Sequence, residues 1–204
     1  MKEHWNDRYA ENEAAYGRNP NKFFATSLSE LEKDDSEGGK NILLPCDGEG
    51  RNAVYAASRG WNVCSFDNSS VGVEKSKLWA TEEGVKIDSQ ISDAFEFNPD
   101  KKFDVIALIF AHMPLELRRE FHHRVLNWLK PGGTILIEGF HKEQFGLKSG
   151  GPKKIEMLFD DKMLKADFAG IKIVSINKKI QTLDEGAFHQ GKAVTLQFHG
   201  KSLP

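Results

Sequence analysis

Short apolar segments alternate with helical segments from residue 41 to residue 140, and this alternation restricts the possible fold more than any other feature of the sequence. The segment 103–110 is nearly all apolar, as expected of a central parallel strand that is covered on both faces. Alternation of this kind predicts a doubly wound α/β sheet. We expect strands at 41–45, 61–66, 85–91, 103–110, 134–140, 170–179 and 193–199. We expect helices at 51–59, 71–83, 114–128 and 160–168, the third of them stopped by Lys130-Pro-Gly-Gly133.

The last two expected strands have no helix between them, and they are joined directly through residues 182–191. Strands joined in this way usually pair antiparallel, because a parallel crossover needs a dozen or more residues. The sequence therefore predicts a seven-stranded, mostly parallel, Rossmann-like sheet with an antiparallel last strand. With 204 residues, we expect a single domain, 1–204, in which residues 1–40 form an N-terminal arm and helix that end in a polar linker at 32–40.

Net charge, apolar runs and cysteine content indicate which partners and which compartment to expect. The formal net charge of −2 gives no field that favours nucleic acid or anionic lipid, so we expect neither as a partner. The charged N-terminus does not resemble a signal peptide, and the longest apolar run is too short to cross a bilayer, so we expect a cytoplasmic protein. Cys46 and Cys64 are expected to be reduced thiols, no zinc-type spacing is present, and a monomer is adequate for this size.

The sharpest local signal is Asp47-Gly-Glu-Gly-Arg-Asn52, between the first strand and its helix. A glycine-rich turn there lets a ligand approach the backbone, although G-x-G alone is weak evidence and no third glycine follows. Asp67 ends the second strand about 20 residues later, the spacing at which a carboxylate meets ribose hydroxyls. The alternative is that Asp67 only caps the helix near Ser70. The paired glycine turn favours the ribose role.

Two further strand ends supply candidates. Asp93 follows the third strand and is placed to accept from an adenine amino group, with Ala94 as a backbone donor, while a solvated turn aspartate is a serious competing interpretation. Phe110 begins Phe-Ala-His-Met-Pro at the fourth strand end, where ligands of open α/β sheets bind.

Taken together, the order of these segments from Asn41 to Phe140 resembles a class I S-adenosylmethionine (SAM)-dependent methyltransferase. It is more closely similar to the tellurite-resistance methyltransferases, and more distantly to thiopurine methyltransferases. The resemblance rests on Trp5-Asn-Asp-Arg-Tyr9, Tyr16-Gly-Arg-Asn-Pro-Asn21, Gly48-Glu-Gly-Arg-Asn-Ala53, Gly150-Gly-Pro-Lys153 and Asp184-Glu-Gly-Ala-Phe-His-Gln-Gly191. The last two segments resemble a C-terminal signature of one uncharacterised subgroup.

The resemblance implies a SAM-binding core at 41–140 and acceptor-side loops and last strands at 141–204. Gly48 and Gly50 would make room for the methionine part of SAM, and Phe110 would lie beside the sulfonium. The complete set of cofactor residues that we expect is Trp5, Tyr16, Asp47, Gly48, Gly50, Asn52, Asp67, Asn68, Asp93, Ala94 and Phe110. The chain departs from the family at Leu44, Cys46 and Asp47, where the first motif usually has an acid, a glycine, and a glycine or cysteine. Asp47 is placed to replace the missing carboxylate and to attract the positively charged groups of SAM.

The expected function is methyl transfer from SAM to a small-molecule acceptor by in-line alignment, leaving S-adenosylhomocysteine and needing no catalytic triad. His112 and His189 are the candidate catalytic residues, the latter because it falls in a strand connection. His122 and His123 are expected at the surface of their helix. The remaining acceptor-side candidates are Phe140, His141 and Lys153. Analogy with the family favours a small, soft or anionic acceptor. Two alternatives stay open: a SAM-binding sensor or partner subunit without turnover, and a nucleotide-dependent oxidoreductase.

Overall fold

The computed structural model describes residues 2–33 and 39–204, which divide into two compact units. The first unit runs to Asn98 and also contains residues 185–187, and the second contains the rest of the chain from Pro99 onward. The expectation of one domain over 1–204 stays a prediction. The expected linker at 32–40 falls partly outside the described residues, and its first two residues end a helix.

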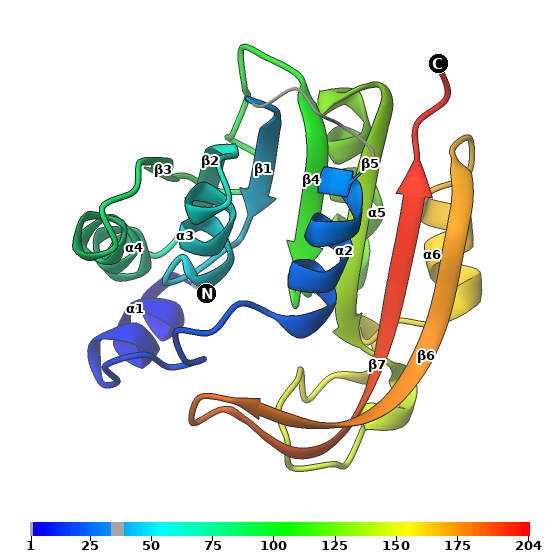
Figure 1. Ribbon diagram of the computed structural model, residues 1–204. Coiled ribbons are helices and arrows are strands. Elements are labelled where there is room, and N and C mark those ends of the chain that lie inside the picture. The colour runs from blue at the N-terminus through cyan, green and yellow to red at the C-terminus, as the bar shows by residue number, and fades with distance from the viewer. Residues whose placement is uncertain (1, 34–38) are drawn as a thin grey trace. The chain divides into compact units, whose positions relative to one another are not determined.

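The first unit contains three parallel strands in the order β3-β2-β1 (Figure 1). Its elements are α1 (Lys2–Ala10), α2 (Lys22–Lys33), β1 (Asn41–Pro45), α3 (Arg51–Ser58), β2 (Asn62–Asp67), α4 (Ser70–Glu82) and β3 (Ile87–Ile91). The register pairs Pro45 with Phe66 and Asp67 with Ile91. Because the strands are parallel, the loops after β1, β2 and β3 leave the sheet at the same edge.

The second unit contains four strands in the order β4-β5-β7-β6. Its elements are β4 (Phe103–Ile109), α5 (Leu115–Trp128), β5 (Leu129–Phe140), the 3₁₀ helices η1 (Lys142–Gln144) and η2 (Ile155–Met157), α6 (Asp161–Asp167), β6 (Lys172–Glu185) and β7 (His189–Lys201). β4 and β5 are parallel, and β5 and β7 are antiparallel. Seven strands, mostly parallel with an antiparallel end, confirm the predicted fold class.

Two regions differ most from the sequence-based expectation: the start of β5 and the connection between β6 and β7. β5 begins at Leu129 and includes the expected turn, because Leu129 already pairs with Phe103 before the register shifts and Val105 pairs with Thr134. The four residues between Leu129 and Thr134 are therefore a bulge within the strand.

The connection expected at 182–191 is much shorter in the structure. β6 continues to Glu185 and β7 begins at His189, so that only residues 186–188 form the turn of a long, curved hairpin (Figure 1). The expectation that His189 lies in a loop is wrong, because backbone pairing continues through the polar residues of the hairpin.

Candidate functional site

The turn after β1 is built from residues in left-handed backbone conformations. Cys46, Gly48 and Gly50 have φ values of 56°, 57° and 87°. The Gly50 N–H donates to the Asp47 carbonyl at 3.0 Å, which closes the turn. Left-handed φ is easy for glycine and costly for a residue with a Cβ. Cys46 thus holds a conformation that suits the glycine found at this position in the resembling family.

Asp67, at the end of β2, meets this turn directly. Its carboxylate accepts the Gly48 N–H on Oδ2 at 2.9 Å and the Ser69 N–H on Oδ1 at 2.8 Å. The side chain is buried, and this burial raises the pKa of Asp67 above its usual value. The cap of α4 is Ser69, whose hydroxyl accepts the Gly72 N–H at 3.0 Å. The glycine turn and the strand-end acid, 19 residues apart in sequence, therefore form one structure.

Asp47 supports the start of α3, since Gly50 at the N-cap position has no side chain to do so. Its two carboxylate oxygens accept from the Asn52 side-chain amide and from the Ala53 N–H, both at 3.1 Å. Burial raises the pKa of Asp47 to about 7, against the effect of these hydrogen bonds. Its ionisation is thus poised near neutral pH, where a cationic ligand favours the charged form.

The remaining cofactor candidates of the first unit lie near the ends of β2 and β3. Asn68 is half-buried directly after Asp67, and Ala94 is buried. Asp93 is exposed, and its carboxylate accepts the Phe95 N–H at 2.9 Å, which is the turn geometry of the competing interpretation.

The N-terminal arm packs on the same turn through a residue to which the sequence analysis gave no role. The Tyr9 hydroxyl lies against Gly48, at the position that a Cβ on this glycine would take. Trp5 stacks on Tyr9 with ring centroids 5.7 Å apart, and Tyr16 lies 6.5 Å from the Trp5 ring. The i,i+4 spacing of Trp5 and Tyr9 on a helix was the available signal.

Lys75 of α4 ties the arm in place. Its ammonium group donates to the backbone carbonyls of Tyr9, Asn12 and Glu13, the last at 3.2 Å, and to Glu49 at 3.1 Å. Glu49 also accepts the Ala15 N–H at 2.8 Å. The turn after β1 therefore anchors the arm that covers it.

In the second unit, Phe110, Phe140 and His189 form an aromatic cluster. The ring centroids of Phe110 and His189 are 4.5 Å apart, and that of Phe140 is 4.8 Å from Phe110 and 5.1 Å from His189. Phe110 has a φ of 54°, and its N–H donates to the Glu138 carbonyl at 2.7 Å. A bulky residue in this conformation is strained, which is a feature of functional sites.

The glycine loop and the C-terminal signature also meet in this unit. A Cβ on Gly150 would lie 2.6 Å from the His189 ring, and one on Gly151 would lie 2.9 Å from the Phe140 ring. Both glycines have positive φ, 114° and 97°. Close packing of Gly150 against His189 and of Gly151 against Phe140, together with this conformation, accounts for the Gly150-Gly151 pair.

His112 differs from the expectation of a catalytic base. Its Nδ1 lies 2.8 Å from the Met157 carbonyl oxygen, and its Nε2 accepts the Phe140 N–H at 2.9 Å. Burial lowers the pKa of His112 to about 4. Both ring nitrogens are thus held by backbone groups, and the neutral ring is a structural bridge between β5 and the segment before α6.

Of the other three acceptor-side candidates, only Phe140 belongs to the aromatic cluster. His141 caps η1 by accepting the Glu143 N–H at 3.1 Å, and Lys153 is exposed. Phe140, by contrast, is buried at the centre of the aromatic cluster.

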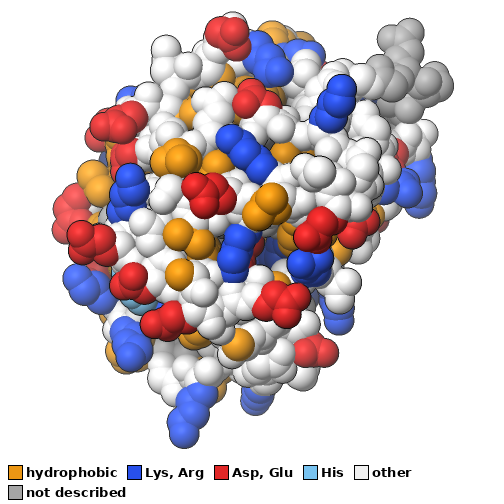
Figure 2. Space-filling view, turned by 90° about the vertical axis from the view of Figure 1, so that its left-hand side faces the viewer, with side chains coloured by type: hydrophobic (Ala, Val, Ile, Leu, Met, Phe, Trp, Pro, Cys, Tyr) orange, Lys and Arg blue, Asp and Glu red, His pale blue; other side chains and the backbone are white. Residues whose placement is uncertain are grey.

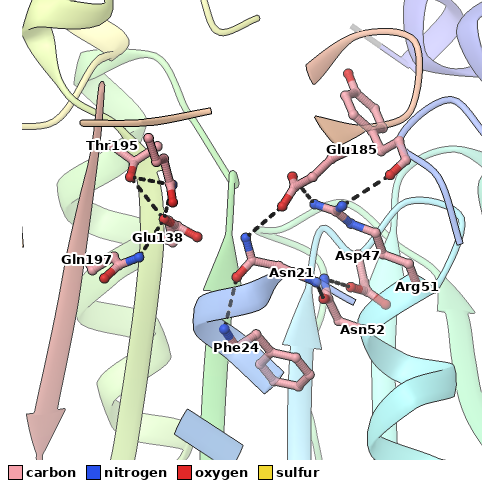
Figure 3. Close-up of polar contacts among 11 residues, drawn as sticks. Asn21, Phe24, Asp47, Arg51, Asn52, Glu138, Glu185, Thr195 and Gln197 are labelled. Carbon is pink, nitrogen blue, oxygen red and sulfur yellow. Dashed lines mark hydrogen bonds and ion pairs between the residues drawn. The ribbon is translucent and has the colours of Figure 1, made fainter. Parts of the chain in front are cut away.

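Sequence reasoning missed two buried polar groups in the second unit. Oε1 of Glu138 accepts from Gln181 and Thr195 at 3.0 Å and from Gln197 at 2.9 Å (Figure 3). The register that places Glu138 opposite Gln197 was not readable from the sequence.

The second missed group corrects the expectation for His122, which is buried rather than exposed. Its Nδ1 lies 2.9 Å from Oδ2 of Asp167, and the Arg118 Nε donates to the same oxygen at 2.7 Å. The partner residue on α6 lies 45 positions away in sequence, so the helix pattern of α5 alone could not reveal this burial.

Comparison with known proteins shows what the central part of the chain is similar to. Residues 42–133 match the sequence family described as a methyltransferase domain. This part of the chain is similar to methyltransferase domains. The predicted resemblance to class I SAM-dependent methyltransferases is thereby confirmed.

A curated relative of this chain is the 2-heptyl-1-hydroxyquinolin-4(1H)-one methyltransferase of Mycobacteroides abscessus, 27% identical over 112 residues. The match covers 53% of this chain and 49% of the relative, so the chain spans about half the length of that protein.

Two solved structures share the fold. TehB from Haemophilus influenzae has a TM-score of 0.69 at 18% identity, over 87% of this chain and 62% of that chain. N-methyltransferase NodS from Bradyrhizobium japonicum, in complex with S-adenosyl-L-homocysteine, has a TM-score of 0.71 at 10% identity, over 98% of this chain and 97% of that chain.

Within residues 2–33 and 39–204, no helix is both long and apolar enough to cross a membrane. The same residues contain no cluster of three or more His, Cys, Asp or Glu side chains that could hold a metal ion.

Proposed function

We propose that this chain is a SAM-dependent methyltransferase that acts on a small-molecule acceptor. The observation that carries the proposal is the hydrogen bond between the Gly48 N–H and the Asp67 carboxylate, which joins the left-handed turn after β1 to the acid at the end of β2. The methyltransferase domain match and the S-adenosyl-L-homocysteine bound in NodS support SAM as the cofactor.

The first unit supplies the residues that would hold SAM. An ionised carboxylate has about four acceptor sites, so Asp67 can accept from a ribose hydroxyl in addition to the backbone N–H groups of Gly48, Asn68 and Ser69. Asp47, with its pKa near 7, provides a negative charge for the cationic cofactor. Trp5 and Tyr16, on the arm, would cover it, while Gly48, Gly50, Asn52, Asn68, Asp93 and Ala94 complete the proposed set.

SAM supplies an activated methyl group on a sulfonium, so the protein has to align the acceptor and remove a proton only if the acceptor carries one. His189, whose ring packs against Phe110 and Phe140, is our candidate for the proton acceptor. In the second unit, the half-buried ring of Phe110 favours a planar, apolar acceptor. The hydroxyquinolinone named for the curated relative belongs to that class.

We further propose a cytoplasmic, monomeric, single-domain protein that does not act on nucleic acid or membranes. The net charge of −2 supports the last two points, and Figure 2 shows basic and acidic side chains interspersed over one face without a large area of one sign.

Calorimetry with SAM, S-adenosylhomocysteine and NAD tests the cofactor. We expect binding of the first two and none of NAD, and we expect Asp67→Ala to weaken SAM binding by roughly 1–3 kcal/mol through lost hydrogen bonds. An unchanged dissociation constant for this variant would refute the role of Asp67. An assay of S-adenosylhomocysteine release over a panel of hydroxyarenes, amines and tellurite tests turnover. SAM binding without release from any acceptor would favour the sensor alternative.

A further inference from the structure

Three segments that are far apart in the sequence meet beside the turn after β1: residues 15–21, residues 48–53 and residues 185–187. The tightest contact is between two glycines. A Cβ on Gly186 would collide with the Gly17 N–H and would lie 2.5 Å from the Ala15 carbonyl oxygen. Gly17 and Gly186 have φ values of 73° and 68°. Only glycine satisfies both the conformation and the approach at Gly186, so the tip of the hairpin is shaped to lie against the arm.

An ion pair reinforces this contact. Glu185 and Arg51 are joined at 2.9 Å, and their side chains are only 10% and 9% exposed. Arg51, in the first turn of α3, also donates to the Tyr16 carbonyl at 3.1 Å (Figure 3). A buried pair of this kind holds its geometry firmly, because removing one partner leaves an uncompensated charge.

A second path leads from Glu185 to the turn itself. The Asn21 side chain donates to Oε1 of Glu185 at 3.3 Å, and the Asn21 N–H donates to the Asn52 side chain at 3.0 Å. Asn52 donates in turn to Asp47 (Figure 3). A continuous set of polar contacts therefore connects Glu185 with the carboxylate that begins α3.

We propose that Glu185 is a positioning residue for the cofactor turn, acting through Arg51 and through Asn21 and Asn52. This inference rests on the proposed function in taking SAM as the ligand of that turn. It gives the Glu-Gly pair of the hairpin tip a role distinct from that of His189 in the same signature. Glu185 also balances the charge of Arg51 next to a site for a cation.

The charge balance makes the proposal distinguishable from a purely structural role. Glu185→Gln keeps the size and an acceptor oxygen but removes the ion-pair partner of Arg51 and so adds one net positive charge beside the turn. The sulfonium of SAM is positive and the thioether of S-adenosylhomocysteine is neutral, so the variant should lose affinity for SAM more than for S-adenosylhomocysteine. A general loosening of the fold would weaken both ligands alike.

The test is calorimetry with both ligands on the full chain. For Glu185→Gln we expect SAM to bind about tenfold more weakly and S-adenosylhomocysteine to change by less than about threefold. The double variant Arg51→Gln/Glu185→Gln removes both charges and should restore the wild-type ratio of the two affinities. Glu82→Gln is the matched control, because the Arg18–Glu82 pair has the same length of 2.9 Å but side chains that are 48% and 57% exposed.

Amide hydrogen exchange of residues 47–53 in the ligand-free protein is an independent measurement. Exchange should accelerate in Glu185→Gln and not in Glu82→Gln. Wild-type affinities for both ligands in Glu185→Gln, or an equal loss for both that the double variant does not correct, would overturn the proposal. If the wild-type protein binds no SAM, the proposed function is refuted instead. Hydrogen exchange of the turn would then still decide whether Glu185 positions it. If Glu185→Gln does not fold, the double variant and the exchange of its turn serve in its place.

Discussion

The Tyr9 hydroxyl lies against Gly48, so near the position of a Cβ on this residue that the two atoms would collide. Burial, followed by the nearby charge of Asp67, raises the pKa of Tyr9 well above its usual value, so the phenol stays neutral. The first helix and the turn after β1 thus fit each other only when residue 48 is glycine. The arm is part of the proposed cofactor site rather than an appendage to it.

Gly48→Ala should therefore destabilise the protein for two reasons that can be separated. The left-handed φ costs an alanine roughly 1–2 kcal/mol, and the collision with Tyr9 adds to this cost. Urea unfolding measures the sum. Gly60→Ala is the control, since Gly60 has a φ of 89° but no atom within 4 Å of the added Cβ. Equal losses for the two variants would mean that the Tyr9 contact contributes nothing.

A second prediction concerns Cys46. Its φ of 56° is strained for a residue with a Cβ, and burial raises the pKa of the thiol, so that it stays protonated. Cys46→Gly relieves the strain while increasing the entropy of the unfolded chain, and these effects nearly cancel at about 1 kcal/mol each. We expect a small change in unfolding free energy and unchanged or tighter SAM binding by calorimetry. Cys64→Gly, at a buried position within β2, should lose more stability. A large loss of SAM affinity in Cys46→Gly would assign a role to the thiol itself.

The sequence predicted the elements between residues 41 and 140 because their patterns are local. Buried parallel strands are continuous apolar runs, and the helices between them have their own periodicity. The meeting of the turn with Asp67 was also predictable, since neighbouring parallel strands end at one edge of the sheet. The cofactor roles of the individual residues stay predictions.

Contacts between distant segments were not predictable in the same way. Nothing local to Glu185 indicates Arg51, 134 positions away, and nothing local to His122 indicates Asp167. His112 was interpreted as a base from its place at a strand end, but its two backbone partners are 28 and 45 positions away. The burial and hydrogen bonds of a titratable side chain depend on the residues that pack around it. A single sequence does not show which residues these are.

The raised pKa of Asp47 predicts a dependence of stability on pH. Asp47 ionises near pH 7 in the folded chain, compared with an ordinary value of 3.8, so its contribution to stability is present below about pH 4 and is lost as the pH rises through 7. Asp47→Asn removes this dependence. Between pH 4 and pH 8, the unfolding free energy of the wild type should therefore fall relative to that of the variant by more than about 1 kcal/mol.

The comparison needs a control on the surface of the same unit. Asp88→Asn alters an exposed aspartate on β3 and should follow the wild-type pH profile. Parallel profiles for Asp47→Asn and the wild type would contradict the raised pKa. In the wild type, the ratio of the affinities for SAM and S-adenosylhomocysteine should increase over the same pH range. In Asp47→Asn, this ratio should not change with pH.

The buried group of Arg118, His122 and Asp167 should control stability at acidic pH. Although burial acts in the opposite direction, hydrogen bonds from His122 and Arg118 lower the pKa of Asp167 to about 2. A carboxylate with a depressed pKa in the folded state contributes stability that is present above its ordinary value of 3.8 and is lost as the pH falls toward 2. Burial also lowers the pKa of His122, so its protonation opposes folding in the same direction.

Asp167→Asn should destabilise the protein by about 3–5 kcal/mol at pH 7, because it leaves the buried Arg118 guanidinium without its counter-charge. It should also flatten the acid side of the stability curve between pH 4 and pH 2. Unfolding in urea at several pH values measures both effects. Glu143→Gln breaks the exposed Lys178–Glu143 pair of the same unit and should change both much less, because solvent screens this pair. If Asp167→Asn unfolds at the wild-type urea concentration at pH 7, the packing of α5 against α6 does not depend on this charge.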